Sequence, residues 1–401
     1  NPAQDATIGI AGAYTNPAGL GFMRTGWHLG FDLQSAYQTR SDKAYFPAFA
    51  LGEVNGVKNA TDGCKTFEGK AKAPVIPSFD LARVGERWFA SFHFGITGGG
   101  GKCKFNDGLP SFESQVAMLP VLVGAIAPGA VTGYTMDTHM QGRQYYLGGQ
   151  FGVGYKITPN FNASIGGRVV YAQCNYYGYV RDIKVGAMPL YQVLDPSKPN
   201  AANIELSCDQ SGLGFTPILA VDYKTGKWNF AAKYEFKTRM RLKNKAVNYA
   251  PSIGNLADNL RAAYIQAGVP EAAADAILGN EHVTAAMGQL KSQFDQKLGA
   301  AIGEYEDGKK IAGDIPAYLA IGAGYKPIDA LRINVGFHWF DDKHATSYND
   351  RQKLLKRGTL EWNAGAEYDV CKKLTVSAGW QNTNYGISDE YMEDRSFVVG
   401  S

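Results

Sequence analysis

Long stretches of this chain alternate between apolar residues and polar or small residues. Between Trp27 and Tyr37 the odd positions are mostly apolar or aromatic, whereas the even positions are polar or small. A period of two sends one kind of side chain to each face of a β-strand. The pattern predicts strands at 26–40, 74–84, 88–98, 143–157, 161–175, 212–224, 228–241, 315–326, 330–343, 358–370 and 373–385, with the start of another at 396–401.

The connections between these strands alternate in length. Short turns fall at 85–87, 158–160, 225–227, 327–329 and 371–373. Long segments fall at about 41–73, 101–142, 176–211, 242–314 and 344–357. Short turns on one rim and long loops on the other predict an all-β fold, a transmembrane antiparallel β-barrel of the outer-membrane type. A soluble β-sandwich or a lipocalin-like barrel is the alternative, although sandwich strands are usually only about five or six residues long.

Composition favours one large architecture over several soluble domains. Only 19% of the 401 residues are charged, and 48 are glycine and 23 tyrosine. A barrel with an apolar outer face, small inward residues and aromatic girdles has this composition. The net charge of +3 gives no indication of nucleic-acid binding. The longest uncharged stretch, 114–136, contains Pro120 and Pro128, so we do not expect a membrane-spanning helix there.

The two ends of the chain bear on how such a barrel would close. Bacterial single-chain barrels have an even number of strands and normally close through a C-terminal strand. The segment 396–401 is short for that purpose. We therefore expect that the last strands lie beyond Ser401. We also expect that a signal peptide preceded Asn1, because the sequence does not begin with one.

The N-terminal segment carries the clearest family resemblance. Asp5-Ala6-Thr7 is followed by Tyr14-Thr15 and the box Asn16, Pro17, Ala18, Gly19, Leu20, immediately before the first strand. These residues resemble the N-terminal plug of the FadL family of outer-membrane long-chain fatty acid transporters. The resemblance implies a 14-stranded barrel in the intact protein, of which 26–401 would be all but about the last two strands. It also implies a hatch formed by 1–25 in the lumen and helical extracellular loops.

The same resemblance implies a function. Family members import hydrophobic molecules, which are captured at apolar extracellular loops, pass the hatch and leave sideways where a barrel strand is kinked. The expected partners are a hydrophobic small-molecule ligand and outer-membrane lipid. A second hypothesis is that the barrel serves as an accessory partner of a secretion or attachment complex, because large apolar loops would suit that role equally well.

Two loops carry apolar residues suited to ligand capture. In 242–314 many recur at intervals of three and four, which predicts amphipathic helices. The predicted substrate-binding residues are Leu260, Tyr264, Met287, Leu290 and Phe294 in that loop and Leu119, Leu122, Val123 and Ile126 in 101–142. The alternative is that these side chains pack on one another over the barrel mouth.

Four consecutive glycines end the third predicted strand. Gly98, Gly99, Gly100 and Gly101 permit backbone angles that other residues avoid and place no side chain in the wall. They are predicted to form a kink with a lateral opening, and a flexible turn is the alternative. A phosphate-binding loop is excluded because Cys103 follows Lys102 where Ser or Thr would be needed.

A fatty-acid carboxylate would need a shielded cation inside the barrel. Where family members place an arginine late in the fifth strand, this chain has Gln173, which departs from the family pattern. The remaining candidates for carboxylate binding are Arg168, Lys353, Lys356 and Arg357. Other inward charges, such as Lys233 and Glu235, are expected to form a structural ion network.

The chain has five cysteines and six histidines. On the predicted topology Cys64 and Cys103, and likewise Cys174 and Cys208, share the loop-side rim, so two disulfides are conceivable in an oxidising compartment. The histidines are scattered, and we expect no metal site. Neither a G-x-S-x-G nor an H-E-x-x-H motif is present, so we expect no enzyme and no cofactor, with an outer-membrane lipase or protease as a minor alternative.

Overall fold

The fold is one antiparallel sheet whose long strands follow one another in chain order. The computed structural model describes residues 2–121, 133–266, 268–292, 303–388 and 395–400. The strands that form the wall are β1 (Gly26–Tyr45), β4 (Cys64–Val84), β5 (Trp88–Phe105), β6 (Tyr134–Thr158), β7 (Phe161–Val185), β9 (Ile204–Thr225), β10 (Trp228–Glu235), β13 (Tyr318–Ile328), β14 (Leu331–Phe340), β15 (Thr359–Cys371), β16 (Leu374–Asn384) and β17 (Arg395–Gly400). Each pairs with the next, so the predicted strand order is confirmed.

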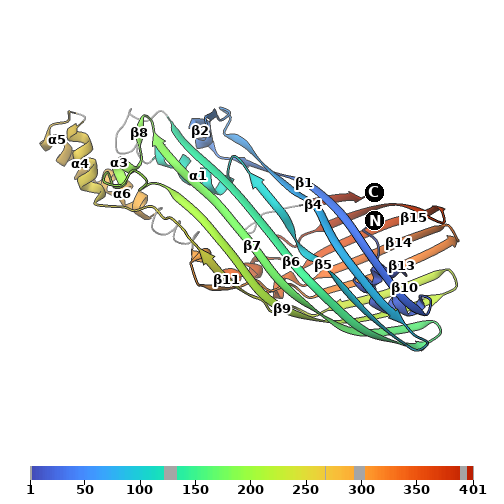
Figure 1. Ribbon diagram of the computed structural model, residues 1–401. Helices are drawn as coiled ribbons and strands as arrows, with labels where there is room; N and C mark the ends of the chain where they lie inside the picture. The colour runs from blue at the N-terminus through green and yellow to red at the C-terminus, as the bar shows by residue number, and fades with distance from the viewer. Residues whose placement is uncertain (1, 122–132, 267, 293–302, 389–394, 401) are drawn as a thin grey trace.

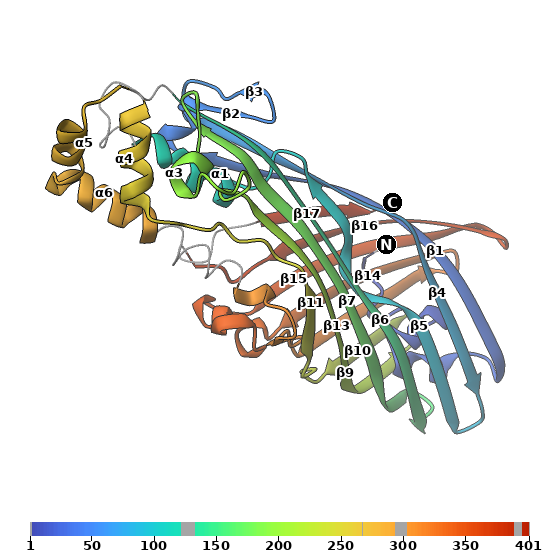
Figure 2. The ribbon, with the colours of Figure 1, turned by 60° about the vertical axis from the view of Figure 1, so that its left-hand side comes forward.

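The sheet curls around the N-terminal segment (Figures 1 and 2). The short turns gather at one end, and the long connections gather at the other, where most of the helices lie. Those connections contain the short strands β2 (Gly52–Val54), β3 (Val57–Lys58), β8 (Met188–Pro189), β11 (Arg241–Ala246) and β12 (Lys310–Ala312) and the helices α1 (Pro110–Ala117), α3 (Tyr191–Leu194), α4 (Leu256–Gln266), α5 (Glu271–Leu278) and α6 (Glu281–Ser292). Within the described residues β1 and β17 each pair on one side only, so they form the two edges of the curl.

The two faces of the sheet differ as the alternation predicts. On β1, Trp27 and Leu29 point outward and are 70% and 69% exposed. On the inward face, polar residues such as Asp80, Gln150 and Asp222 are buried. A curled sheet that is apolar outside and polar inside is the arrangement of a membrane barrel wall. No helix in the part of the chain that the structure describes is long and apolar enough to cross a membrane.

The strands are longer than the alternation indicated. β4 begins at Cys64, where residues up to 73 were predicted to form a loop, and β7 continues to Val185, past the predicted end at 175. Beyond Tyr171 the outward residues of β7 become polar or amphipathic, as with Gln173, while backbone pairing continues. The alternation of apolar and polar residues therefore ends before the strand itself ends.

One predicted strand is divided. The segment 228–241 forms β10 up to Glu235, and pairing resumes at Arg241 in β11. Its neighbour is divided at the same level, between β12 and β13. A single bridge between Thr238 and Ile315 joins the two irregular segments.

Candidate functional site

The N-terminal segment is seated inside the curl, and the Asn-Pro-Ala-Gly box forms its anchor. Pro17 opens the 3₁₀-helix η2 (Pro17–Phe22), where its missing N–H is not needed. Asn16 caps this helix, because its Oδ1 accepts a hydrogen bond from the Gly19 N–H at 3.2 Å. Its Nδ2 donates to the Asp222 carboxylate of β9. Ala18 and Leu20 are fully buried, so the box packs closely against the strands of the sheet.

The glycine of the box is required by close packing. A Cβ atom at Gly19 would lie 2.4 Å from Asn16 Nδ2 and 2.8 Å from Asp222 Oδ2. A Cβ atom at Gly21 would lie 2.5 Å from Asn162 Nδ2 of β7. A side chain at Gly19 would displace the Asn16 and Asp222 side chains, and one at Gly21 would displace that of Asn162, so each would disturb the contacts that seat the helix.

Side chains from the wall also hold the backbone of the segment. Gln150 Nε2 on β6 donates to the Ala13 carbonyl at 2.8 Å, and Lys233 Nζ on β10 donates to the Tyr14 carbonyl at 3.0 Å. Asn229 Nδ2 donates to the Ala6 carbonyl at 2.8 Å. Sequence analysis did not single out Gln150 or Asn229, although both occupy inward positions of their strands.

The first residues of the segment enter a second polar cluster. His338 Nε2 on β14 lies 2.9 Å from Asp5 Oδ2, and His338 Nδ1 lies 3.0 Å from Glu361 Oε2 on β15. The imidazole therefore bridges the segment to two neighbouring strands. Below this cluster, at the short-turn end, a cavity of about 980 Å³ is lined by Ala6–Ile8 and by basic residues such as Lys224 and Arg332.

Arg168 lies in a buried ion cluster under the Tyr14 ring. It donates to Glu235, whose Oε1 also lies 2.9 Å from Lys233 Nζ. Its guanidinium carbon lies 5.2 Å from the Tyr14 ring centroid. Arg168 is 5% exposed, and its Nε and Nη1 atoms have no hydrogen-bond partner in the described residues. Two basic side chains share one carboxylate here, and Arg168 keeps two donors that have no partner in the described residues.

The hydrogen-bond ladder between β4 and β5 is interrupted at the four glycines. Lys72 pairs with Lys102 and Ser78 with Gly95, but 73–77 and 96–101 between these pairs have no mutual register. Segment 73–77 includes two prolines, which cannot donate to a ladder. Gly99 has φ 97° and Gly101 has φ 67°, angles that favour glycine. The β4–β5 ladder therefore has a break at the four glycines, and the lateral opening there stays a prediction.

Comparison with known proteins supports the same architecture. No protein-family model matches the sequence, and no curated protein matches it. Solved structures do match. A Pseudomonas aeruginosa FadL homologue has a TM-score of 0.54 at 13% identity, over 98% of this chain and 80% of that one. The chain has the FadL fold.

Two further matches share that FadL fold. The Ralstonia pickettii toluene transporter TbuX aligns with a TM-score of 0.51 at 14% identity, over 96% of this chain and 86% of that one. The monoaromatic hydrocarbon channel CymD aligns with a TM-score of 0.50 at 13% identity, over 96% and 81%. The predicted FadL resemblance is confirmed at the level of the fold.

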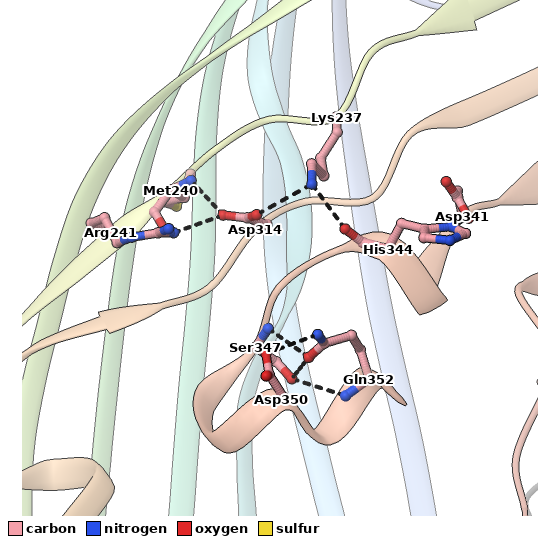
Figure 3. A network of polar contacts seen from close by, with 9 residues as sticks. All are labelled: Lys237, Met240, Arg241, Asp314, Asp341, His344, Ser347, Asp350 and Gln352. Atoms are coloured by element: carbon pink, nitrogen blue, oxygen red, sulfur yellow. Dashed lines mark hydrogen bonds and ion pairs between the residues drawn. The ribbon is translucent and has the colours of Figure 1, made fainter. Parts of the chain in front are cut away.

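In this FadL-like sheet, the division of β10 from β11 is held by Asp314 (Figure 3). Its Oδ1 accepts from the Met240 N–H and from Arg241 Nη1, both at 3.0 Å. Lys237 Nζ lies 3.9 Å from Asp314 Oδ2 and donates to the His344 carbonyl at 2.9 Å. One buried carboxylate thus adds side-chain hydrogen bonds to the few backbone bonds that join the two irregular segments.

Replacement of Asp314 is expected to destabilise this part of the wall. Hydrogen bonds to charged groups contribute about 1.5–3 kcal/mol each, so Asp314→Ala should lower the free energy of unfolding by at least about 1.5 kcal/mol. The measurement is unfolding of the detergent-solubilised protein. Asp329→Ala, in an exposed turn, is the control and should change it by less than about 0.5 kcal/mol. Equal effects of the two variants would contradict the bridging role.

The predicted capture residues of the two loops meet at the helical end of the FadL-like barrel. Leu119, Leu260 and Leu290 are 2%, 8% and 2% exposed and belong to one apolar cluster. Tyr264 and Met287 pack against it and remain half-exposed. Of the predicted residues, Leu122, Val123, Ile126 and Phe294 lie outside the described residues. The packing favours a loop core, with a ligand surface only at its edge.

The predicted helices of the longest loop are present as α4, α5 and α6. An exposed ion pair joins two of them. Arg261 on α4 donates to Asp275 on α5 at 2.6 Å and to Glu271 at 3.3 Å. The Arg261 guanidinium holds the pKa of the Asp275 carboxyl below its usual value.

The remaining cation candidates lie apart from the lumen cluster. Lys353, Lys356 and Arg357 are exposed, in the connection between β14 and β15. Lys353 Nζ pairs with Asp350 at 2.7 Å, and Arg357 Nη2 donates to Asn384 Oδ1 at 2.6 Å. Of the four predicted carboxylate ligands, only Arg168 is buried in the lumen.

The cysteines do not form the predicted disulfides, and all five are free thiols. Cys103 faces Ala71 on β4, seven positions from Cys64, which is about 23 Å along a strand. A disulfide needs Cα atoms within about 7 Å, so the Cys64–Cys103 pairing is wrong. Cys174 and Cys208 lie diagonally on neighbouring strands and are unpaired.

Proposed function

We propose that this protein is an outer-membrane transporter that takes up hydrophobic small molecules. The observation that carries the proposal is the N-terminal segment seated inside the curl, beside the break in the β4–β5 ladder. A solute that passes the hatch would reach the break at Gly98–Gly101 and could leave into lipid without crossing water. The apolar outer face supports a position in a membrane, because lipid-exposed strands must present apolar side chains.

In this proposal three regions of the protein would carry out capture, entry and release of the solute. The edge of the loop cluster, with Tyr264 and Met287, would capture an apolar solute. The hatch anchored by Asn16 and Asp5 would control entry to the lumen. The break at Gly98–Gly101 would provide lateral release. This sequence of steps follows the family scheme, and TbuX and CymD, which share the fold, are themselves named as a toluene transporter and a monoaromatic hydrocarbon channel.

The experiment is extraction of the purified protein with organic solvent and mass spectrometry of the extract. We expect co-purified hydrophobic molecules, and faster uptake of the same molecules by cells that produce the protein than by cells that lack it. Extraction of no ligand, together with a tightly bound protein, would instead support the accessory role in a surface complex.

The Arg168 cluster supports a carboxylate-bearing ligand over a neutral one. The two unpartnered donors of the charged Arg168 guanidinium suit a bound anion. Arg168→Gln leaves Glu235 paired with Lys233, so the Glu235 carboxylate should keep an ion-pair partner. We expect the affinity for a long-chain fatty acid to fall about 10- to 150-fold, the equivalent of one charged hydrogen bond. Affinity for a hydrocarbon of equal length should not change.

Direct binding titrations of the two ligands test this expectation. Lys353→Gln, at an exposed position, is the matched loss of charge and should alter neither affinity. A parallel loss of acid and hydrocarbon binding in Arg168→Gln would show that Arg168 acts only on structure.

A further inference from the structure

Five basic side chains form two rows across the outer face of β4, β5 and β6. In one row Lys72 stands opposite Lys102, and Lys102 stands opposite Arg143. In the other row Lys70 stands opposite Lys104. We call these five residues the basic rows. Adjacent strands lie about 4.8 Å apart and the rows are two residues apart, so five cations occupy an area of about 10 by 7 Å.

The basic rows point away from the lumen. Lys70 and Lys72 are exposed, whereas Phe67, Gly69 and Ala71, which alternate with them on β4, are buried. Directly opposed residues of a sheet share a face, so Lys102, Lys104 and Arg143 point outward as well.

The rows begin where the apolar band of the outer face ends. On β6 the outward positions include Val153, Phe151, Leu147 and Tyr145, and Arg143 is the next one toward the loops. Its guanidinium carbon lies 5.7 Å from the Tyr145 ring centroid. In a membrane barrel this border is the level of the lipid headgroups, where aromatic girdles lie.

The positive charge of the rows is not offset within the protein. Among the described residues none of the five makes an ion pair with an acid, although Glu68 shares the outward face of β4. Asp209, two strands away, accepts from Asn175. Arg143 Nε is buried without a hydrogen-bond partner. Like charges directly opposite one another destabilise a sheet, and here two such lysine pairs are adjacent.

We propose that the basic rows bind the phosphate groups of a phosphorylated lipid in the outer leaflet of the membrane. The proposal rests on the membrane orientation of the proposed function. Ammonium and guanidinium groups are the partners that phosphate oxygens prefer in proteins, and the neighbouring apolar band would hold the acyl chains. A free anion or a soluble polyanion would have no reason to favour the border of that band.

The position of the rows gives this lipid a structural effect. Lys72 and Lys102 form the last pair of the β4–β5 ladder before the break at 73–77 and 96–101. A lipid phosphate between them relieves their repulsion and ties the two strands together at the loop-side end of the break. The lipid therefore keeps the opening from extending toward the loops.

The test uses the full-length purified protein in a neutral detergent. The probes are bisphosphorylated lipid A, the same lipid after removal of both phosphates, and inorganic pyrophosphate. We expect the affinity for lipid A to exceed the affinities for the other two probes by at least about 30-fold. In the double variant Lys72→Gln, Lys102→Gln the affinity for lipid A should fall by at least about 30-fold. Lys227→Gln with Lys326→Gln, at the short-turn end, is the matched control and should bind lipid A normally.

Thermal unfolding provides a second measurement that does not depend on affinity. Without lipid, Lys72→Gln with Lys102→Gln should unfold at a higher temperature than the unmodified protein, because a repulsive pair is gone. Lipid A should raise the unfolding temperature of the unmodified protein and not that of the variant. Equal binding of phosphorylated and dephosphorylated lipid, or of pyrophosphate and lipid A, would overturn the proposal. Ligand extraction and uptake test the transport function separately, so the two hypotheses can fail independently.

Discussion

A disulfide across the break between β4 and β5 is expected to stop uptake of the hydrophobic ligand. A Cβ atom at Gly101 would lie 3.2 Å from the Ala73 Cβ atom, close to the 3.5–4.5 Å that disulfides span. The variant carries Ala73→Cys and Gly101→Cys, with Cys103→Ser to remove the neighbouring thiol. Uptake by cells should fall to that of cells without the protein after oxidation, and should return after reduction.

Comparing the oxidised and reduced forms of one variant separates the effect of the crosslink from the strain that the substitution itself causes. Gly101 has φ 67°, where a cysteine costs about 1–2 kcal/mol, and this strain is present in both forms. The control is Arg83→Cys with Ala90→Cys, which face one another in the paired part of the same two strands. Unchanged uptake with a complete Ala73–Gly101 crosslink would rule out a lateral release that needs β4 and β5 to separate at these two residues.

Displacement of the hatch is the second large effect. Gly19→Val places a side chain where a Cβ atom would already lie 2.4 Å from Asn16 Nδ2. Such overpacking costs about 1–3 kcal/mol, which corresponds to an increase of about 5- to 150-fold in the population of displaced hatch. The lumen should then pass ions, and conductance in a planar bilayer should rise accordingly.

The same segment provides the control for this prediction. Gly9 has an extended backbone and open space around it, with nothing within 4 Å of a Cβ atom. Gly9→Val should therefore leave conductance unchanged. If Gly19→Val conducted no better than Gly9→Val, the seat formed by Asn16 and Asp222 would not be what closes the lumen.

The alternation of apolar and polar residues was sufficient to predict the strands and their order. Trp27 and Leu29 alternate with polar or small residues, and the structure exposes them while burying inward polar residues such as Asp222. This works because the lipid face and the lumen face impose opposite requirements on neighbouring positions. The Asn-Pro-Ala-Gly box was also informative, because its helix cap joins Asn16 to Gly19, which are close in the sequence.

Features that depend on register could not be predicted in the same way. The wrong Cys64–Cys103 pairing arose because both residues were assigned to one rim, whereas the structure pairs Cys103 with Ala71. The basic rows were missed for the same reason, since Lys70 and Lys104 become neighbours only through the pairing of β4 with β5. Clusters such as Asp5 with His338 join residues more than 300 positions apart, and no local pattern records them.

The length of β6 and β7 determines where a solute first meets this protein. Each strand has 25 residues, which is about 85 Å of strand and, at a tilt of about 40°, about 65 Å of height. A membrane of this kind needs only about 25 Å of apolar wall. On β6 the nine residues beyond Arg143, where the apolar band ends, account for about 23 Å of this height. Under the proposed function a hydrophobic solute would therefore meet the protein in the water above the lipid headgroups.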